Sequence, residues 1–309
     1  MKVRIILLAA LALALASCSD RYAVIGGYAQ GGVYSVKYNT RGVKASRAEV
    51  QKAVDGILEA IDTTLSGYNR KSLLSRRNAG EEVERNDMFR EVEALSEHYR
   101  ELSGGAFDVA AGPLFNIWGF GFTRDSLPSE SAIAAAMERS RRREVLNFNA
   151  IAQGYSCDKV AAYLHSIGVT DMLVDIGEIY CEGLNPEGRG WSIGIDTPAD
   201  GNETPGADLS GIWHSDGGAY GVVTSGNYRK FYVHDGKKYA HTIDPRTGRP
   251  VEHDLLSATV IAPTATEADA LATYFMVIGT EPARAYVEAN EGIEACLISA
   301  SGIWKSEGF

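Results

Sequence analysis

The sequence lacks a surplus of positive charge. It contains 30 Lys and Arg residues against 40 Asp and Glu residues, which gives a formal net charge of −10. Proteins that bind nucleic acid usually present a basic face to the phosphates, so we expect no nucleic-acid partner. An acidic protein that binds an anionic ligand generally holds it through a divalent metal or through local backbone amides.

The common nucleotide-binding and hydrolase motifs are also absent. No Gly-x-Gly-x-x-Gly run follows a predicted strand, so the sequence does not support a Rossmann dinucleotide site. It has no P-loop, no His-Glu-x-x-His motif and no Gly-x-Ser-x-Gly motif. Any nucleotide chemistry must therefore come from another arrangement of residues.

Cysteine is scarce, with four residues in the chain. The spacing of Cys157, Cys181 and Cys296 fits no zinc or iron–sulfur pattern. We expect these three to be buried small apolar residues, and a disulfide pair is the less favoured alternative.

Long apolar runs are missing except at the N-terminus. Ile5–Ala16 is too short to span a membrane and follows two basic residues, which is typical of a signal peptide. The run ends in Leu15-Ala16-Ser17-Cys18, which is similar to a bacterial lipobox. We therefore expect residues 1–17 to be a lipoprotein signal peptide and residues 18–27 to be a tether that begins at lipidated Cys18. This predicts a lipid-anchored protein of the bacterial cell envelope that faces the periplasm; an ordinary secretion signal is the alternative.

Apolar periodicity predicts both helices and strands in the rest of the chain. Helices are expected at 46–65, from 86 to the glycines at 104–105, and at 128–143, 151–167, 267–278 and 281–289. Strands are expected at 33–38, 145–148, 172–176, 192–195, 220–224, 230–233, 256–261 and 293–298, with loops at 66–80 and 106–122. Because the elements show no regular βαβ alternation and no clear linker, we predict an α+β fold with one compact domain over residues 28–309.

Asp269 and Thr273 are candidate metal ligands. They lie four residues apart in a predicted helix and share one face of it. A carboxylate and a hydroxyl are oxygen ligands that suit Mg²⁺. Helix capping by Asp269 and back-bonding by Thr273 are the structural alternatives.

Three further polar clusters lie at predicted element boundaries. Residues 239–250 are dense in glycine, proline and charge and contain His241, residues 224–228 follow an apolar strand, and residues 149–154 precede a helix. Each cluster offers hydroxyls, an imidazole or backbone amides to a phosphate, or forms only a turn.

Taken together and in order, these clusters resemble the ApbE-type family of FAD:protein FMN transferases. The similarity runs from about Gly31 to Ile298, nearly the whole chain after the signal peptide. It is carried by residues 104–114, 118–121, 224–226, 241–248 and 267–273. The resemblance implies a T-fold-like domain of mixed helices and mostly antiparallel sheet.

The resemblance also implies a site that holds FAD with its pyrophosphate on Mg²⁺. By that similarity the metal would be bound by the side chains of Asp269 and Thr273 and by the carbonyl oxygen of Ala150. The implied FAD contacts are Tyr68 on the isoalloxazine; Ala106, Phe107 and Asp108 along the flavin and ribityl; Thr224, Ser225 and His241 near the phosphates or adenosine; and Asn147 and Gln153.

Several positions depart from the family pattern. Gln30 and Gly32 stand where Met and Thr are usual, and Asn147 stands where an Asp commonly contacts FAD. Gln153 replaces a frequent Lys or Glu, and Asn149 replaces a small residue. The Gly177-Glu178 pair is one glycine short of the usual run. FAD binding is therefore the part of the implied function that these changes affect most.

The implied reaction splits the FAD pyrophosphate and attaches FMN to a Thr or Ser hydroxyl of an exported or membrane redox protein, with release of AMP. Charge neutralisation and an in-line nucleophile suffice for such a step. His241 is the first candidate for the general base, and Asp244 or Asp269 are alternatives. The competing hypotheses are an FAD pyrophosphatase, a non-catalytic FAD-binding lipoprotein and a structural surface lipoprotein.

Overall fold

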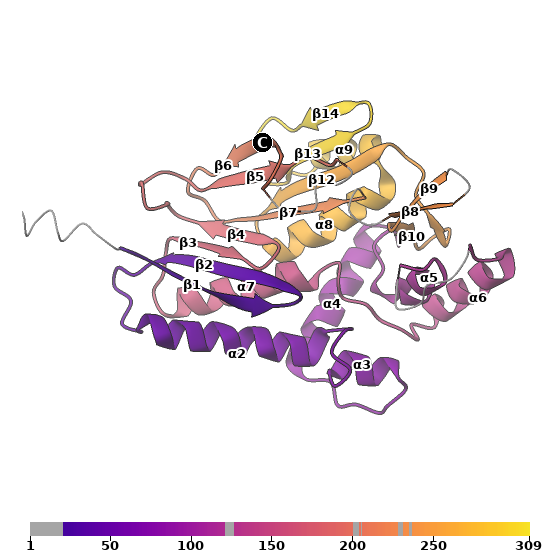
Figure 1. The fold of residues 1–309 in the computed structure, drawn as a ribbon, viewed down its shortest axis with the longest axis horizontal. Coiled ribbons are helices and arrows are strands. Elements are labelled where there is room, and N and C mark those ends of the chain that lie inside the picture. Colours follow the sequence, from indigo (N-terminus) through magenta and orange to yellow (C-terminus); the bar gives the residue numbers. More distant parts are fainter. Residues whose placement is uncertain (1–20, 121–126, 200–203, 205, 228–230, 235–236) are drawn as a thin grey trace, which may run out of the picture.

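The computed structural model describes residues 21–120, 127–199, 204, 206–227, 231–234 and 237–309. Its centre is an antiparallel sheet in the order β1-β2-β3-β4-β7-β12-β13-β14 (Figure 1). The strands are β1 (Tyr22–Ala29), β2 (Gly32–Asn39), β3 (Met172–Asp175), β4 (Ile179–Glu182), β7 (Tyr220–Gly226), β12 (Leu255–Ala262), β13 (Glu294–Ser299) and β14 (Gly302–Lys305). The predicted α+β class with an antiparallel sheet is confirmed.

Helices cover one face of this sheet, and a hairpin covers the other. The helices are α2 (Arg47–Leu65), α3 (Leu73–Asn78), α4 (Asp87–Leu102), α5 (Gly112–Ile117), α6 (Glu130–Arg141), α7 (Ala152–Ser166), α8 (Ala265–Ile278) and α9 (Thr280–Ala289), with a 3₁₀ turn η1 (Val109–Ala111). Apolar residues of α2 and α7 pack on β1 to β3, and those of α8 and α9 pack on β12 and β13. The hairpin of β5 (Ser192–Asp196) and β6 (Leu209–His214) packs its tryptophan and isoleucine side chains against the opposite face.

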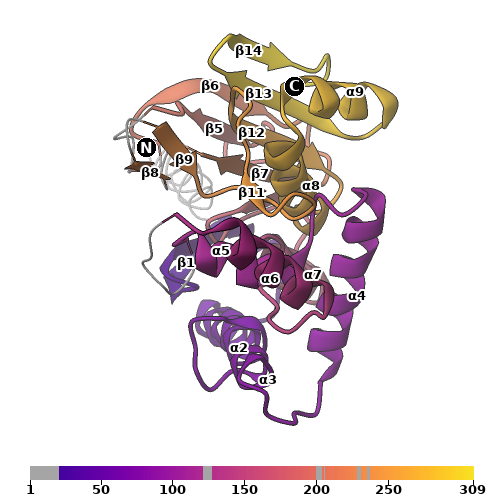
Figure 2. The same ribbon diagram turned by 90° about the vertical axis from the view of Figure 1, so that its right-hand side faces the viewer.

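Two smaller hairpins lie beside α5 and α6 (Figures 1 and 2). They are formed by β8 (Phe231–His234) with β9 (Lys237–Ala240), and by β10 (Ile243–Asp244) with β11 (Arg249–Pro250). The second hairpin carries the 241–248 run, so it places that run near the segment that contains η1 and α5.

The predicted helix at 46–65 forms for the reason that the sequence indicates. Ser46 caps α2, and the Ser46 and Glu49 side chains satisfy each other's backbone amides in a capping box. Val50, Val54 and Leu58 then lie on the buried face. The helices predicted at 128–143, 151–167, 267–278 and 281–289 are also present, with ends shifted by no more than two residues.

Four predicted segments differ in the structure. The proposed tether overlaps β1, which pairs along its whole length with β2 but buries only Ile25, so its sequence shows little alternation. The loop at 66–80 contains α3, and the loop at 106–122 contains η1 and α5. Residues 145–148 form no strand. The side chain of Asn78 accepts the amide of Leu146 at 3.0 Å and donates to its carbonyl oxygen at 2.8 Å, so neither group is left for a neighbouring strand.

Cys157, Cys181 and Cys296 are buried free thiols, as predicted. Cys18 lies outside the described residues, as do Gly121 of the 118–121 run and Tyr228 of the 224–228 cluster. In the described part of the chain, no helix combines the length and the apolar character that a membrane crossing needs.

Candidate functional site

The first turn of α7 lies unusually close to the first turns of α8. The amide of Gly154 donates a hydrogen bond to Oδ2 of Asp269 at 3.0 Å. A Cβ atom at position 154 would lie 2.2 Å from the carbonyl oxygen of Ala265 and 2.8 Å from Cβ of Asp269. Glycine is therefore required for this helix contact, a role that the sequence analysis did not assign to Gly154.

Asp269 is the most strongly perturbed carboxyl group of the predicted site. The residue is 4% exposed. Burial raises its pKa to about 7; the hydrogen bond from Gly154 opposes this change, and the nearby charge of Asp158 adds to it. Among the described residues, none donates a hydrogen bond to its other oxygen, Oδ1. One carboxylate oxygen thus stays available to a ligand.

Thr273 lies on the helix that carries Asp269, and Ala150 lies just before the helix whose Gly154 amide bonds to Asp269. Thr273 is half-buried one turn further along α8, on the same face as Asp269. Ala150 precedes α7 and packs with Ile151 and Tyr155 on the apolar cluster that contains Ala270 of α8. The structure therefore brings the start of α7 to the helix face that carries the two predicted side-chain ligands.

This donor set fits Mg²⁺ better than it fits a softer metal. Its members are one carboxylate, one hydroxyl and one backbone carbonyl, all of them oxygen donors. Within the described ranges, no group of three or more His, Cys, Asp or Glu side chains is arranged to hold a metal. A site with one carboxylate leaves coordination positions for phosphate oxygens and water, as Mg²⁺ usually requires.

Tyr68 lies near the start of α7 and is largely accessible. Its side chain is among the exposed large hydrophobic groups, at 68%. Nδ2 of Asn149 donates to its hydroxyl at 3.2 Å, which links the loop after α2 to the residue before Ala150. The hydrogen bond thus places the Tyr68 hydroxyl next to the residue that precedes the predicted ligand Ala150.

Ala106 and Phe107 are buried rather than exposed to a ligand. Phe107 makes an edge contact with Tyr99 at a centroid distance of 6.1 Å and belongs to the same cluster as Ile151 and Ala270. Both residues are 1% exposed, so any contact of theirs with FAD stays a prediction.

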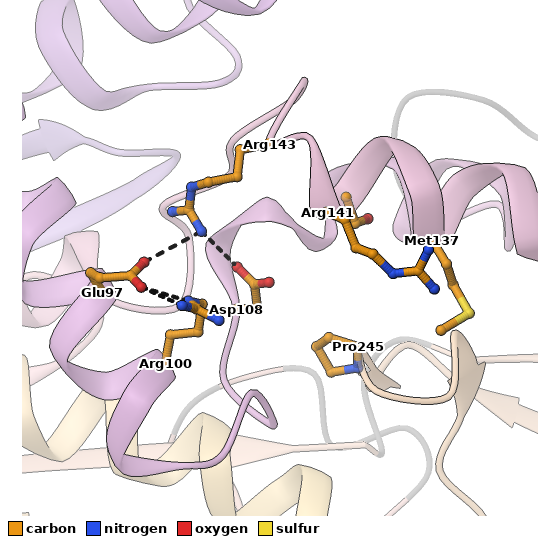
Figure 3. A pocket seen from close by; sticks show the side chains of 8 residues that line it. Glu97, Arg100, Asp108, Met137, Arg141, Arg143 and Pro245 are labelled. Atoms are coloured by element: carbon orange, nitrogen blue, oxygen red, sulfur yellow. Dashed lines mark hydrogen bonds and ion pairs between the residues drawn. The ribbon is translucent and has the colours of Figure 1, made fainter.

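Asp108 lines a cavity of about 280 Å³ next to this segment (Figure 3). Its Oδ1 accepts the amide of Ala110 at 2.8 Å, and Arg143 lies 3.6 Å away. Burial raises the pKa of Asp108, although both of these contacts oppose the change. The remaining lining residues are Glu97, Arg100, Met137, Ser140, Arg141, Arg143 and Pro245.

His241 follows β9, and the run that it opens is tied to two other parts of the site. Its ring lies edge-on to Phe120 at a centroid distance of 6.3 Å. Nε1 of Trp118 donates to the carbonyl oxygen of Gly248 at 2.8 Å, and the hydroxyl of Thr242 donates to the side chain of Asn227. The segment that follows α5, the 241–248 run and the end of β7 therefore form one connected wall.

Thr224 and Ser225 lie on β7, which β12 flanks. The hydroxyl of Thr224 contacts that of Thr259 at 2.8 Å, and Ser225 pairs in register with Ala258. Asp244, the alternative base, accepts two hydrogen bonds from the guanidinium of Arg246 at 2.9 Å. The carboxylate of Asp244 is therefore engaged by Arg246.

The side chains of Asn147 and Gln153 make hydrogen bonds to backbone atoms of the protein itself. Oδ1 of Asn147 accepts the amide of Asn149 at 2.9 Å. Nε2 of Gln153 donates to the carbonyl oxygen of Ile176 at 3.2 Å. These bonds shape the turn before α7 and fix it to the loop after β3, so any contact of the two residues with FAD stays a prediction.

Comparisons with known proteins agree with this arrangement. The family model described as "ApbE family" matches residues 31–297. A protein of Haemophilus influenzae named FAD:protein FMN transferase is 32% identical over 92% of this chain and 89% of the relative. A protein of the same name from Salmonella typhimurium is 33% identical over 87% of this chain and 81% of its own.

Solved structures give the same result for the fold. The apo form of the flavinyl transferase ApbE from Pseudomonas stutzeri superposes with a TM-score of 0.81 and 34% identity, over 94% of this chain and 96% of its own. The flavin transferase ApbE from Vibrio cholerae superposes with a TM-score of 0.78 and 31% identity, over 93% of this chain and 98% of its own.

Proposed function

Because the chain belongs to the ApbE family, we propose that it is an FAD:protein FMN transferase. It splits FAD and attaches the FMN half through a phosphoester bond to a Thr or Ser hydroxyl of an exported or membrane redox protein. The observation that carries the proposal is the buried carboxylate of Asp269, which lies inside the matched family region. One of its oxygens accepts the Gly154 amide, and the other is available to a metal ion.

The residues of the site have separate parts in this reaction. Asp269, Thr273 and the carbonyl of Ala150 would hold Mg²⁺, which neutralises charge on the pyrophosphate when it is bound. Tyr68 offers an exposed ring on which the isoalloxazine stacks. The rest of the dinucleotide would lie along residues 106–108 and the 241–248 run, which share one cavity through Asp108 and Pro245.

The bond changes follow from the products. The acceptor hydroxyl attacks the phosphorus nearer to riboflavin and loses its proton, the P–O bond to the AMP half breaks, and AMP leaves. His241 is the proposed base for that proton, because Asp244 is bound to Arg246 and the carboxylate of Asp269 is assigned to the metal. Orientation and electrostatic stabilisation supply most of the rate in phosphoryl transfer, so one base is sufficient.

An acceptor-peptide assay tests the function. The mature protein is incubated with FAD, Mg²⁺ and a peptide that carries Asp-Gly-x-x-(Ser/Thr)-x-(Ser/Thr), and we expect a covalent fluorescent flavin on the peptide and one AMP for each transfer. Loss of a residue that only supports a metal ligand typically costs roughly 10–100-fold in activity. Asp269→Ala removes a proposed ligand itself, so it should lower the rate by more than that. Glu267→Gln, which removes a carboxylate from the same helix, is the matched control and should stay near the parent rate.

The alternatives give different results in the same assay. Release of free FMN at the same rate with and without peptide indicates an FAD pyrophosphatase. FAD that stays intact with both Mg²⁺ and peptide indicates a protein that only binds it. Transfer that is unaffected by Asp269→Ala contradicts the metal assignment but leaves flavin transfer itself in place.

The same proposal includes the location of the enzyme. We place it in the bacterial cell envelope, anchored through diacylated Cys18 and facing the periplasm, because the first 18 residues have the pattern of a lipoprotein signal peptide. An anchored, exported enzyme meets exported acceptors, which fits the class of partner proposed above.

A further inference from the structure

A second residue of α7 contacts the start of α8. The carboxylate of Asp158 accepts the amide of Ala265 at 2.9 Å through Oδ1 and the amide of Thr266 at 2.8 Å through Oδ2. The hydroxyl of Thr266 donates to the same Oδ2. These are two of the free amides that every helix N-terminus presents, and they are satisfied here by a side chain 107 to 108 residues away in the sequence.

This contact is not the ordinary cap of α8. Thr264 is the N-cap residue, and its hydroxyl accepts the amide of Glu267 at 3.1 Å, as a local cap does. Asp158 adds a bond from another helix. A local cap stabilises the helix wherever it lies, whereas a bond from α7 also fixes where α8 lies.

Asp158 and Gly154 bond to α8 at two points along its axis. They lie four residues apart on one face of α7. Asp158 holds the first two residues of α8, and the Gly154 amide holds Asp269 one turn further along. Two contacts at different heights fix both the axial position and the rotation of a helix. The direction in which Asp269 and Thr273 point is set by that rotation.

We propose that Asp158 is a positioning residue, which holds α8 in the register where Asp269 and Thr273 face the same metal ion. The proposal rests on the function assigned above. Asp158 bonds to the helix that carries the ligands rather than to the ion, so its loss weakens metal binding through geometry. Outer-shell partners of metal ligands typically contribute about 10–100-fold in affinity by this route.

Direct metal binding tests the proposal without measuring catalysis. Mn²⁺, which prefers the same octahedral oxygen ligands, is titrated into the mature protein with saturating FAD, and free Mn²⁺ is followed by its EPR signal. Asp158→Asn should raise the dissociation constant by about 10-fold or more, because an amide group cannot accept both backbone bonds. FAD affinity without metal should stay at the parent value.

Thr264→Ala is the matched control for helix stability. It removes a capping bond that lies within the same helix, so it should lower the melting temperature and leave Mn²⁺ affinity unchanged. If Thr264→Ala weakens Mn²⁺ binding as much as Asp158→Asn does, the effect is one of helix fraying and the positioning role is wrong.

Two further variants complete the test. Thr266→Val removes only the hydroxyl bond to Asp158 and keeps the side-chain volume. It should raise the dissociation constant for Mn²⁺ about three- to ten-fold. If Asp158→Asn does not fold, this variant tests the positioning role in its place. Asp269→Ala should abolish binding. Binding that survives Asp269→Ala overturns the proposed metal site. Binding that is lost with Asp269→Ala but unchanged in the Asp158→Asn and Thr266→Val variants overturns the role of Asp158 alone.

Discussion

Gly154 determines how closely α7 approaches α8. Any larger side chain at this position meets the backbone of Ala265, which cannot rotate away as a flexible side chain can. The hydrogen bond between its amide and Asp269 depends on the same short distance. One glycine thus controls both the helix packing and the orientation of the proposed metal ligand.

We predict that Gly154→Ala destabilises the protein although alanine is the better helix former. Overpacking of this kind typically lowers the free energy of unfolding by about 1–3 kcal/mol. Urea denaturation followed by far-UV circular dichroism measures the change. Gly56→Ala is the control: Gly56 lies in α2 with no atom within 4 Å of an added Cβ, so alanine should raise the free energy of unfolding by about 0.5–1 kcal/mol. Equal effects at the two positions would contradict the steric argument.

The candidate metal ligands could be named from the sequence, but the contacts that surround them could not. The resemblance indicated Asp269, Thr273 and Ala150, and the fold places Asp269 and Thr273 on one face of α8 with the Ala150 turn packed against that helix. Gly154 and Asp158 gave no local signal, because their roles depend on the distance between two helices that are far apart in the chain. Spacing within one helix is set by 3.6 residues per turn, whereas the approach of another helix is set by tertiary packing.

Elements with strong local signals were predicted well, and edge or hairpin strands were missed. The stripe and capping box of α2 are encoded within twenty residues. β1 and β6 each bury few of their side chains, so their sequences carry little alternation. The run at 145–148 has the apolar residues of a strand, yet Asn78 takes the hydrogen bonds that a neighbouring strand would have made.

The contact between α4 and α7 should depend on pH. Glu91 of α4 accepts bonds from Lys159 at 2.8 Å and from the hydroxyl of Tyr155 at 2.7 Å. Burial alone raises its pKa, but these hydrogen bonds outweigh burial and hold the pKa below the ordinary value of 4.5. A carboxyl group with a lowered pKa in the folded state adds stability above its unfolded pKa and loses that stability as the pH falls through the folded value.

Glu91→Gln should therefore reduce the free energy of unfolding at neutral pH by no more than about 1 kcal/mol, because the Glu91 and Lys159 side chains are 47% and 35% exposed. The difference from the parent should shrink below about pH 4.5, as urea denaturation across pH 3 to 7 would show. Glu288→Gln in α9 breaks an ion pair within one helix and is the control, with a change below about 0.5 kcal/mol. A difference for Glu91→Gln that grows on acidification would contradict the assignment.

The whole molecule is one sheet with a helical layer and a hairpin layer, and the site lies where α7 and α8 meet. The first strand of that sheet begins at Tyr22, only four residues after Cys18. The predicted tether is therefore mostly part of the folded domain.

Cys18→Ser tests the proposed anchor. We expect the parent protein to fractionate with membranes and to incorporate labelled palmitate, and the variant to be unlabelled and released in the soluble fraction. Transfer to the acceptor peptide in detergent should be the same for both. Membrane association of an unlabelled variant after a salt wash would contradict anchoring through this residue.

Four peptide units extend at most about 14 Å, which is less than half the thickness of a bilayer core. If Cys18 carries acyl chains as proposed, the edge of β1 sits almost at the headgroups, and the enzyme has little freedom to swing outward. Its search for acceptors then takes place in two dimensions, among proteins that diffuse in the same leaflet plane. A redox subunit embedded in that membrane would be met far more often than one diffusing freely in the surrounding fluid.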